Sequence, residues 1–400
     1  MGCFFDASSF CNIMGFMKKY SLIFGIIFLF SASTASAATV KVSGWIPWWQ
    51  ASAGIVSAKK HLSELDTVHP FAFEVDKNGA LIEKTSLSGS NWQQFFADAR
   101  KNNIAIVPTI NWSDGAQIHT ILSDTTKRNA HIQNIVNMVS NGGYAGVDID
   151  YEQKLAETNP YFSIFLKDLK TALSGKTLSC AIEARTPPAD LAKGGLKTPQ
   201  YANDYAVIGK TCDVVELMAY DQQRIDVTLN TARKGEPYIP VADSAWVEKV
   251  LKLAIKEIPT SKLMLAVPTY GREWTLTVAP EWYKAYAPVQ TLNMPNIEML
   301  ARKYNLTAGK NKAGEMSFSY FPSNSPYSVL NQLATPPGTR QGFEAAAKAL
   351  LFATYAKTEV PVNIVWYPDP NILMNAKNLA KKYNLRGVSI FKIDGDERVW

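Results

Sequence analysis

The sequence has no concentration of charge of one sign. Among its 400 residues, 41 Lys and Arg stand against 35 Asp and Glu, a formal net charge of +6, and the basic residues are scattered along the chain. Proteins that bind nucleic acid normally gather Lys and Arg on one face, so we expect no nucleic-acid partner. The apolar fraction of 47% is that of an ordinary globular protein.

Nucleotide-binding loops are also missing. The first predicted strand is not followed by G-x-G-x-x-G, and G-x-x-x-x-G-K-[ST] does not occur anywhere. Such loops bring backbone N–H groups close to phosphate oxygens, and their absence disfavours a nucleotide-binding sheet. The sequence shows no internal repeat, low-complexity linker or appended binding module, which favours a single catalytic or binding domain.

The N-terminal region contains a short apolar run. Lys18 and Lys19 precede apolar residues over 22–30, and small residues follow over 31–38. Residues 35–37 form the A-x-A pattern of a signal-peptidase site, so we predict that residues 1–37 are a signal peptide and that the protein is secreted or reaches the cell envelope. A single-pass anchor is the alternative, but the run is shorter than the ~20 residues of a membrane span. A start at Met17 would give the same signal without residues 1–16.

Cysteine is scarce. Cleavage of the predicted signal peptide would remove Cys3 and Cys11 and leave Cys180 and Cys212. An exported protein can form a disulfide, but one pair does not make a disulfide framework. We expect the two cysteines on adjacent strands. The sequence leaves open whether they bond, because it does not fix the Cβ geometry that a disulfide requires.

Short apolar runs alternate with longer amphipathic runs over residues 38–400. This alternation is typical of βαβ units, and eight strands with connecting helices favour a closed α/β barrel, the (β/α)8 or TIM barrel, over an open sheet. The predicted strands are 40–47, 68–73, 104–110, 146–151, 178–184, 214–219, 263–269 and 387–393. The predicted helices include 91–102, 127–140, 160–174, 245–257 and 372–384.

The spacing breaks between the seventh and eighth strands. Residues 270–386 separate them, several times the length of an ordinary βα unit. The part over 274–340 is rich in Pro, Tyr, Asn and Ser, contains strand-like pieces such as 316–320, and is too long for a loop. We predict a small α+β insertion there, between strand 7 and helix 7, and a helix over 341–357 that resumes the barrel.

The fourth predicted strand carries three carboxylates at alternate positions. Residues two apart on a strand share a face, so Asp148, Asp150 and Glu152 should all point into the barrel. Mutual repulsion should leave at least one of them protonated near neutral pH. Glu152 is closest to the C-terminal end, where barrels carry their active sites, and is the predicted proton donor. A solvated outward face and a Ca²⁺ or Mg²⁺ site are the alternatives; we expect no metal.

This segment resembles the D-x-x-D-x-D-x-E signature of glycoside hydrolase family 18, the chitinase family. Other segments resemble further motifs of that family in the right order, and the resemblance extends from about residue 40 to the end. They are Ser43-Gly44-Trp45, Asn111-Trp112, Met218-Ala219-Tyr220-Asp221, Pro268-Thr269-Tyr270-Gly271-Arg272, Gly387-Val388 and Asp394-Gly395-Asp396.

The resemblance implies a retaining hydrolase of β-1,4-linked N-acetylglucosamine glycans, such as chitin or chitooligosaccharides, that works by substrate assistance and without a cofactor. Glu152 would protonate the glycosidic oxygen while the sugar's own acetamide attacks the anomeric carbon. Asp150 would accept a hydrogen bond from the acetamide N–H, and Asp148 would share a proton with Asp150. Tyr220 would donate to the acetamide carbonyl, and Asp221 would contact the distorted sugar.

The resemblance also implies a set of glycan-binding residues on the barrel's C-terminal face. Aromatic rings among them would provide platforms for pyranose faces. The set comprises Trp45, Trp112, Met218, Tyr270, Arg272, Trp274 and Phe391. Trp48, Trp49, Trp282 and Trp366 are assigned no role. We expect a monomer whose partner is an N-acetylglucosamine-containing polysaccharide.

Three positions depart from the family pattern. Ala145 replaces the first Asp of the signature, Phe391 stands where the family has a tryptophan, and Gln153-Lys154 replace tyrosine-proline. The first and last departures are similar to the branch that contains bacterial spore-cortex and cell-wall enzymes. A peptidoglycan N-acetylglucosaminidase is therefore an alternative. A different barrel glycosidase, such as an enzyme that cleaves the chitobiose core of N-glycans, is another. An inactive chitin-binding lectin of the same fold is a further one, disfavoured because Glu152 is retained.

Overall fold

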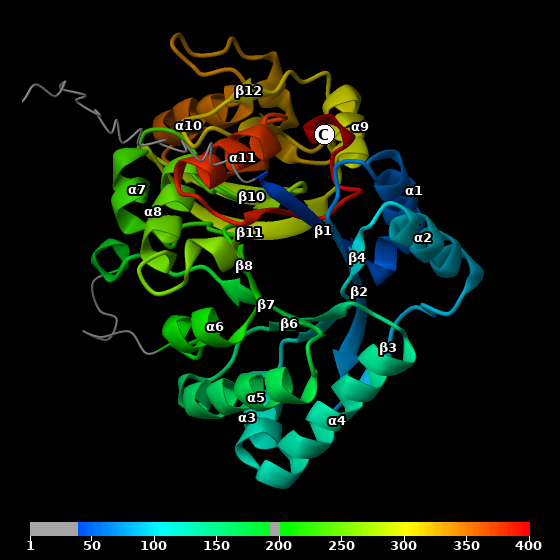
Figure 1. The fold of residues 1–400 in the computed structure, drawn as a ribbon. Coiled ribbons are helices and arrows are strands. Elements are labelled where there is room, and N and C mark those ends of the chain that lie inside the picture. Colours follow the sequence, from blue (N-terminus) through cyan, green and yellow to red (C-terminus); the bar gives the residue numbers. More distant parts are fainter. Residues whose placement is uncertain (1–38, 193–200) are drawn as a thin grey trace, which may run out of the picture. The chain divides into compact units, whose positions relative to one another are not determined.

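The computed structural model describes residues 39–192 and 201–400 (Figure 1). The predicted signal peptide lies outside these residues. Across the described ranges, no helix has the length and apolar character needed to cross a membrane.

Eight parallel strand positions form a closed barrel, as the sequence predicted. The barrel closes because β1 pairs with both its sequence neighbour β2 and the last strand β15. The third position is divided into two short strands. In barrel order the strands are β1 (Lys41–Pro47), β2 (Thr67–Val75), β4 (Ala105–Ile106) with β5 (Thr109–Trp112), β6 (Gly146–Tyr151), β7 (Thr177–Glu183), β8 (Val214–Met218), β9 (Leu263–Pro268) and β15 (Gly387–Phe391). A short strand, β3 (Leu81–Glu83), extends β2 as a hairpin.

Helices cover the outside of the barrel. In α5 (Asn159–Ala172) Pro160 occupies the first turn, where its missing N–H costs nothing, and four large apolar side chains are buried on one face. This helix packs with α3 (Gly115–Ser123) and α4 (Thr125–Asn141) (Figure 1). The other barrel helices are α1 (Ala51–Lys60), α2 (Ser90–Lys101), α6 (Tyr205–Thr211), α7 (Val227–Ala232), α8 (Ser244–Ala254) and α11 (Ile372–Lys382).

The insertion after strand β9 is a five-stranded antiparallel sheet with a helix on each face, drawn yellow to orange in Figure 1. The sheet begins at Gly271 and ends at Tyr367, so it extends beyond the predicted 274–340 at both ends. Its strand order is β11 (Trp282–Leu292), β10 (Gly271–Ala279), β14 (Val360–Tyr367), β13 (Met316–Tyr320) and β12 (Gly309–Lys310). The helices are α9 (Met294–Lys303) and α10 (Glu344–Ala356).

One helix was assigned to the wrong layer. The predicted helix over 341–357 is α10, which packs on β10, β13 and β14 of the insertion, whereas α11 packs on β9 and β15 and resumes the barrel. The buried face of α10 consists of small residues such as Ala346 and Ala349. A face of small residues can pack closely against the barrel or against the insertion sheet. The helix packs on the insertion because of β14, a strand that the sequence analysis did not predict.

Cys180 on β7 and Cys212, just before β8, form a disulfide with an S–S distance of 2.06 Å and a Cα–Cα distance of 6.2 Å. Both cysteines are buried. The cross-link therefore joins β7 to the short segment between α6 and β8, so only Cys180 lies on a strand as expected. The question of whether the two cysteines bond, which the sequence left open, is answered.

Candidate active site

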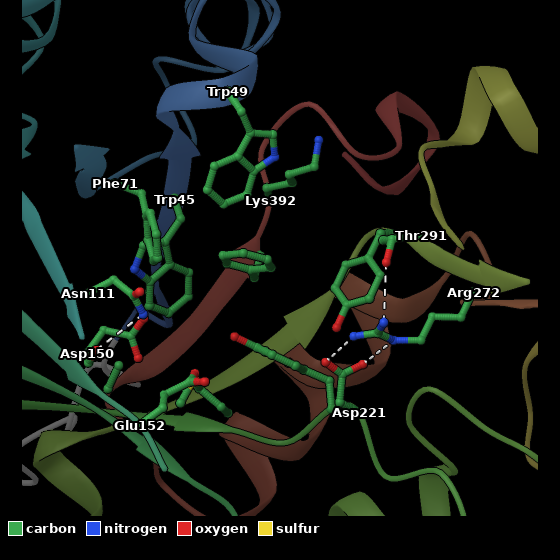
Figure 2. A pocket seen from close by; sticks show the side chains of 15 residues that line it. Trp45, Trp49, Phe71, Asn111, Asp150, Glu152, Asp221, Arg272, Thr291 and Lys392 are labelled. Atoms are coloured by element: carbon green, nitrogen blue, oxygen red, sulfur yellow. Dashed lines mark hydrogen bonds and ion pairs between the residues drawn. The ribbon is translucent and has the colours of Figure 1, made fainter. Parts of the chain in front are cut away.

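Alternation along β6 separates its side chains as predicted. Val147, Ile149 and Tyr151 belong to the core between strands and helices, whereas Asp150 and Glu152 line a cavity at the C-terminal end of the barrel. Figure 2 shows both carboxylates turned into this cavity, which has a volume of about 410 Å³.

Asp148 lies deepest and is fully buried. One of its carboxylate oxygens accepts hydrogen bonds from the Trp45 indole N–H (3.0 Å) and the Thr109 hydroxyl (2.8 Å). Burial raises the pKa of Asp148, and Glu216 adds to the rise, although His69 opposes it. Burial disfavours a charge on His69, but Glu216 and Asp148 outweigh it and raise the pKa of the imidazole. At the bottom of the site, burial and neighbouring charges thus favour the protonated forms of Asp148 and His69.

Asp150 is oriented by the neighbouring strand. Asn111 on β5 stands beside it in register and donates from its amide nitrogen to one Asp150 oxygen over 2.9 Å. The other oxygen has no hydrogen-bond partner within the described part of the chain. Burial raises the pKa of Asp150 well above its ordinary value, and the charges of Glu152 and Asp148 raise it further.

Glu152 ends the row at the open side of the site. Its backbone N–H donates to the Trp112 carbonyl over 2.8 Å, which fixes the main chain where strand β6 ends. Burial raises the pKa of Glu152, with a further rise from Glu183 and Asp221 and an opposing effect of Lys154. A carboxyl group that keeps its proton at higher pH than usual is suited to act as a general acid.

Across the cavity, Asp221 and Arg272 form a bidentate ion pair. The guanidinium Nε and Nη2 lie 2.6 and 2.5 Å from the two carboxylate oxygens, and Nη1 donates to the Thr291 hydroxyl over 3.2 Å (Figure 2). Such paired contacts fix orientation as well as charge. Burial raises the pKa values of Tyr220 and Tyr270 well above the ordinary value, so both remain phenols able to donate a hydrogen bond.

The apolar part of the cavity is an aromatic cluster around Phe391. Its ring stacks on Tyr220 at a centroid distance of 5.9 Å and 24°, and meets Trp45 and Phe71 edge-on at 5.9 and 6.1 Å. Met218 completes this cluster. The site therefore pairs a flat apolar surface with a row of carboxyl groups whose pKa values are raised, which suits an amphipathic ring such as a sugar.

Comparison with known proteins also indicates an enzyme that acts on sugars. The pattern that describes "Glycosyl hydrolases family 18" matches residues 41–396. The chain belongs to glycoside hydrolase family 18. It is therefore a family 18 glycosidase with the TIM-barrel fold.

Similar proteins come from bacteria, plants and animals. The uncharacterized glycosylase YvbX of Bacillus subtilis is 23% identical over 389 residues, covering 94% of this chain and 93% of that protein. The cortical fragment-lytic enzyme of Bacillus anthracis is 24% identical over 329 residues, covering 81% of this chain and 63% of that protein. Among solved structures, the spore cortex-lytic enzyme SleL of Bacillus cereus shares the fold, with a TM-score of 0.65 and 21% identity over 91% of this chain and 74% of that one.

Most of the residues that the family resemblance suggested do line the family 18 cavity. They are Trp45, Asp150, Glu152, Met218, Tyr220, Asp221, Tyr270, Arg272 and Phe391, while Asp148 lies beneath them. The Trp45 indole N–H already donates to Asp148, so only the face of the ring is available to a ligand.

Two predicted sugar platforms are not at the cavity. Trp112 is buried against His131 and Tyr151, on the helix side of the barrel wall. Trp274 is buried in the core of the insertion beneath α10. Trp112 follows Asn111, which does face the site, and a step of one residue along a strand reverses the face. Trp274 lies two residues beyond Arg272, past a register shift in the pairing of β10 with β11, and is covered by α10.

Sequence reasoning missed several residues around the carboxylates. Thr109 and Asn111 hold Asp148 and Asp150, and Phe71, Trp49 and Thr291 line the cavity. A signal for the first two exists in the sequence. Thr109 and Asn111 alternate on β5 just as the acids alternate on β6, and polar residues at alternate positions of neighbouring barrel strands face the same interior.

Proposed function

We propose that this family 18 enzyme is a secreted, retaining glycosidase that hydrolyses β-1,4-linked N-acetylglucosamine glycans with help from the substrate's acetamide. The observation that carries the proposal is the ion pair of Asp221 with Arg272. It engages both oxygens of the carboxylate across the cavity from Glu152. A two-carboxylate mechanism needs a second free acid on the opposite side of the sugar from the general acid. Asp221, which faces Glu152 across the cavity, is occupied by Arg272, and this pairing supports one acid assisted by the substrate.

The proposed first step begins with protonated Glu152. It gives its proton to the glycosidic oxygen, and the bond from that oxygen to the anomeric carbon breaks. The acetamide carbonyl oxygen of the same sugar forms a new bond to the anomeric carbon, giving a cyclic oxazolinium ion. Asp150, through the oxygen that is not held by Asn111, accepts the acetamide N–H and stabilises the positive charge that develops there.

In the proposed second step Glu152, now a carboxylate, takes a proton from water as the water attacks the anomeric carbon. The oxazolinium ring opens, and the product keeps the original configuration. The Tyr220 phenol donates to the acetamide oxygen during ring formation, and Phe391 supports the apolar face of the sugar. Asp148, which accepts hydrogen bonds from Trp45 and Thr109, keeps a proton near Asp150. The three acids therefore do not all ionise together.

For the substrate, we propose soluble or hydrated N-acetylglucosamine strands rather than crystalline chitin, because Phe391 provides a smaller floor than tryptophan. Peptidoglycan is the second candidate beside chitooligosaccharides, supported by the similarity to cortical fragment-lytic enzymes and by the predicted export. Initial rates on chitin hexamer, purified peptidoglycan and crystalline chitin, at matched acetamide concentration, would test this. Fastest turnover on the crystal would contradict the substrate proposal.

Stereochemistry tests the mechanism separately. NMR of fresh products should show the β-anomer first, and glycans without the N-acetyl group at the cleavage position should not react. An initial α-anomer would contradict the oxazolinium route. Glycan binding without turnover of any of these substrates would favour the lectin alternative.

A further inference from the structure

A second cavity lies on the insertion, where β11 meets the loop that follows β8. It has a volume of about 510 Å³ and shares no lining residue with the catalytic cavity. We name it the β11 groove, after its lining residues Arg224, Lys234, Tyr238, Trp282, Tyr283 and Tyr286. A further hollow of about 420 Å³ continues it, sharing Gly235, Glu236, Tyr283 and Leu350.

The groove is aromatic and partly rigid. Trp282 is 54% exposed, an unusual state for the largest apolar side chain. The Tyr286 hydroxyl accepts a hydrogen bond from the Tyr238 backbone N–H over 2.8 Å, and the Arg224 guanidinium lies over the Tyr286 ring at 5.5 Å. The wall is thus held in place before a ligand arrives, while the tryptophan stays open.

The groove carries charges of both signs. Arg224 and Lys234 stand beside Glu236 and Glu281, and Arg340 and Lys312 lie 3.1 and 3.5 Å from Glu236. The remaining charge is slightly positive, so the groove offers hydrogen-bond donors rather than a site for a cation. The exposed ring of Trp282 beside such donors suits a ligand with an apolar face and a polar rim, as a pyranose has.

The groove is also connected with the catalytic cavity by the chain itself. Thr291 lines the catalytic cavity and Tyr286 the groove, and both lie on β11, about 17 Å apart at ~3.4 Å per residue. Asp221 and Arg224 stand three residues apart on the loop after β8. One polymer could therefore contact both places, whereas a short oligomer held in the catalytic cavity could not.

We propose that the β11 groove is a second glycan-binding site, which holds a distant stretch of the N-acetylglucosamine polymer that the catalytic cavity cuts. This inference rests on the proposed function. It assigns Trp282 as the stacking platform, and Arg224 and Lys234 as donors to sugar hydroxyl and acetamide oxygens. The groove would raise the affinity for long strands without touching the reacting bond.

The test uses the full chain and the substitution Trp282→Ala, with Tyr355→Ala as a matched control. Tyr355 is 88% exposed on α10 and lines neither cavity. Binding of chitin hexamer and of solubilised peptidoglycan strands is titrated in the Glu152→Gln background, and chitin trimer turnover is measured with Glu152 intact. Loss of one stacking contact should weaken binding of the long strands about 3- to 10-fold, with trimer kcat/KM unchanged in both variants.

Several results would overturn the inference. These are unchanged long-strand binding in Trp282→Ala, an equal loss in Tyr355→Ala, or a matching loss of trimer turnover. Arg224→Gln provides an independent second variant and should weaken the same binding while leaving the trimer unaffected. Failure of the wild-type protein to cut any N-acetylglucosamine glycan would contradict the proposed function. If the wild-type protein cuts these glycans but Trp282→Ala binds long strands as tightly as wild type, only the proposed second site would be contradicted.

Discussion

The Lys154 ammonium lies 3.6 Å from the Glu183 carboxylate. Lys154 stands two residues after Glu152 in the chain. The Lys154 side chain is 1% exposed, donates to the Tyr151 carbonyl, and places its ammonium over the Phe162 ring at 4.7 Å. Burial lowers the pKa of Lys154. One of the departures from the family pattern thus puts a buried cation, with its counter-charge, beside the proposed acid.

This pair predicts opposite pH shifts. Glu183 raises the pKa of Glu152 and Lys154 lowers it, in a setting that also contains Asp150 and Asp221. A general acid works only while protonated, so Glu183→Gln should move the alkaline limb of kcat/KM to lower pH. Lys154→Met should move it to higher pH, and the double variant should return toward wild type. The pH profiles would be measured together with melting curves. Shifts of the same sign in both single variants would contradict this electrostatic account.

Glu152→Gln should lower kcat by about 10²–10⁴-fold, because the same group acts as acid and then as base. Glutamine keeps the shape of the side chain, so the melting temperature and the binding of chitin hexamer should remain near wild type. Steady-state rates and titration calorimetry on the same preparation measure both. A variant with half the wild-type activity would place the acid elsewhere.

Arg272→Lys should lower kcat/KM about tenfold, a loss of roughly 1.4 kcal/mol, although the positive charge is kept. Lysine cannot reproduce the two parallel contacts with Asp221, so the carboxylate across from Glu152 would lose its fixed orientation. Thr291→Val removes only the 3.2 Å contact with the guanidinium and serves as the control, with a much smaller effect. Equal effects of the two substitutions would argue against a special role for the bidentate pair.

Removing the disulfide should affect stability and not chemistry. The Cys180–Cys212 bond spans 32 positions of sequence, and a cross-link of this length typically contributes about 2–4 kcal/mol to the free energy of unfolding. Urea unfolding of Cys180→Ala with Cys212→Ala should show such a loss, while kcat/KM at 25 °C remains unchanged. An unaltered unfolding midpoint would mean that the bond contributes nothing in solution.

Activity should survive removal of metals. In residues 39–192 and 201–400, no group of three or more His, Cys, Asp or Glu side chains is arranged to hold a metal ion, and the proposed mechanism assigns Asp148, Asp150 and Glu152 to protons and acetamide contacts. We expect full activity after dialysis against a chelator. Activity that disappears and returns with Ca²⁺ or Mg²⁺ would favour the metal alternative for these three residues.

The sequence by itself determined the barrel and the row of acids. Eight apolar runs separated by amphipathic ones leave few other topologies. The two-residue period of a strand puts Asp148, Asp150 and Glu152 on one face whatever surrounds them. These features depend on local spacing, and local spacing is what a sequence records directly.

Only the tertiary structure decided which neighbours those local elements meet. Four features depend on contacts between distant segments. They are the burial of Trp112 and Trp274 away from the cavity, the packing of α10 on the insertion sheet, the Cys180–Cys212 bond and the pairing of Asp221 with Arg272. The type of a side chain does not identify its partner. An apolar side chain is stabilised by burial against any surface of suitable shape, and an ion pair forms wherever closure of the barrel brings two opposite charges together. Contacts between distant segments likewise buried Lys154 beside Glu183, whereas Trp282, on an edge strand of the insertion sheet, stayed exposed.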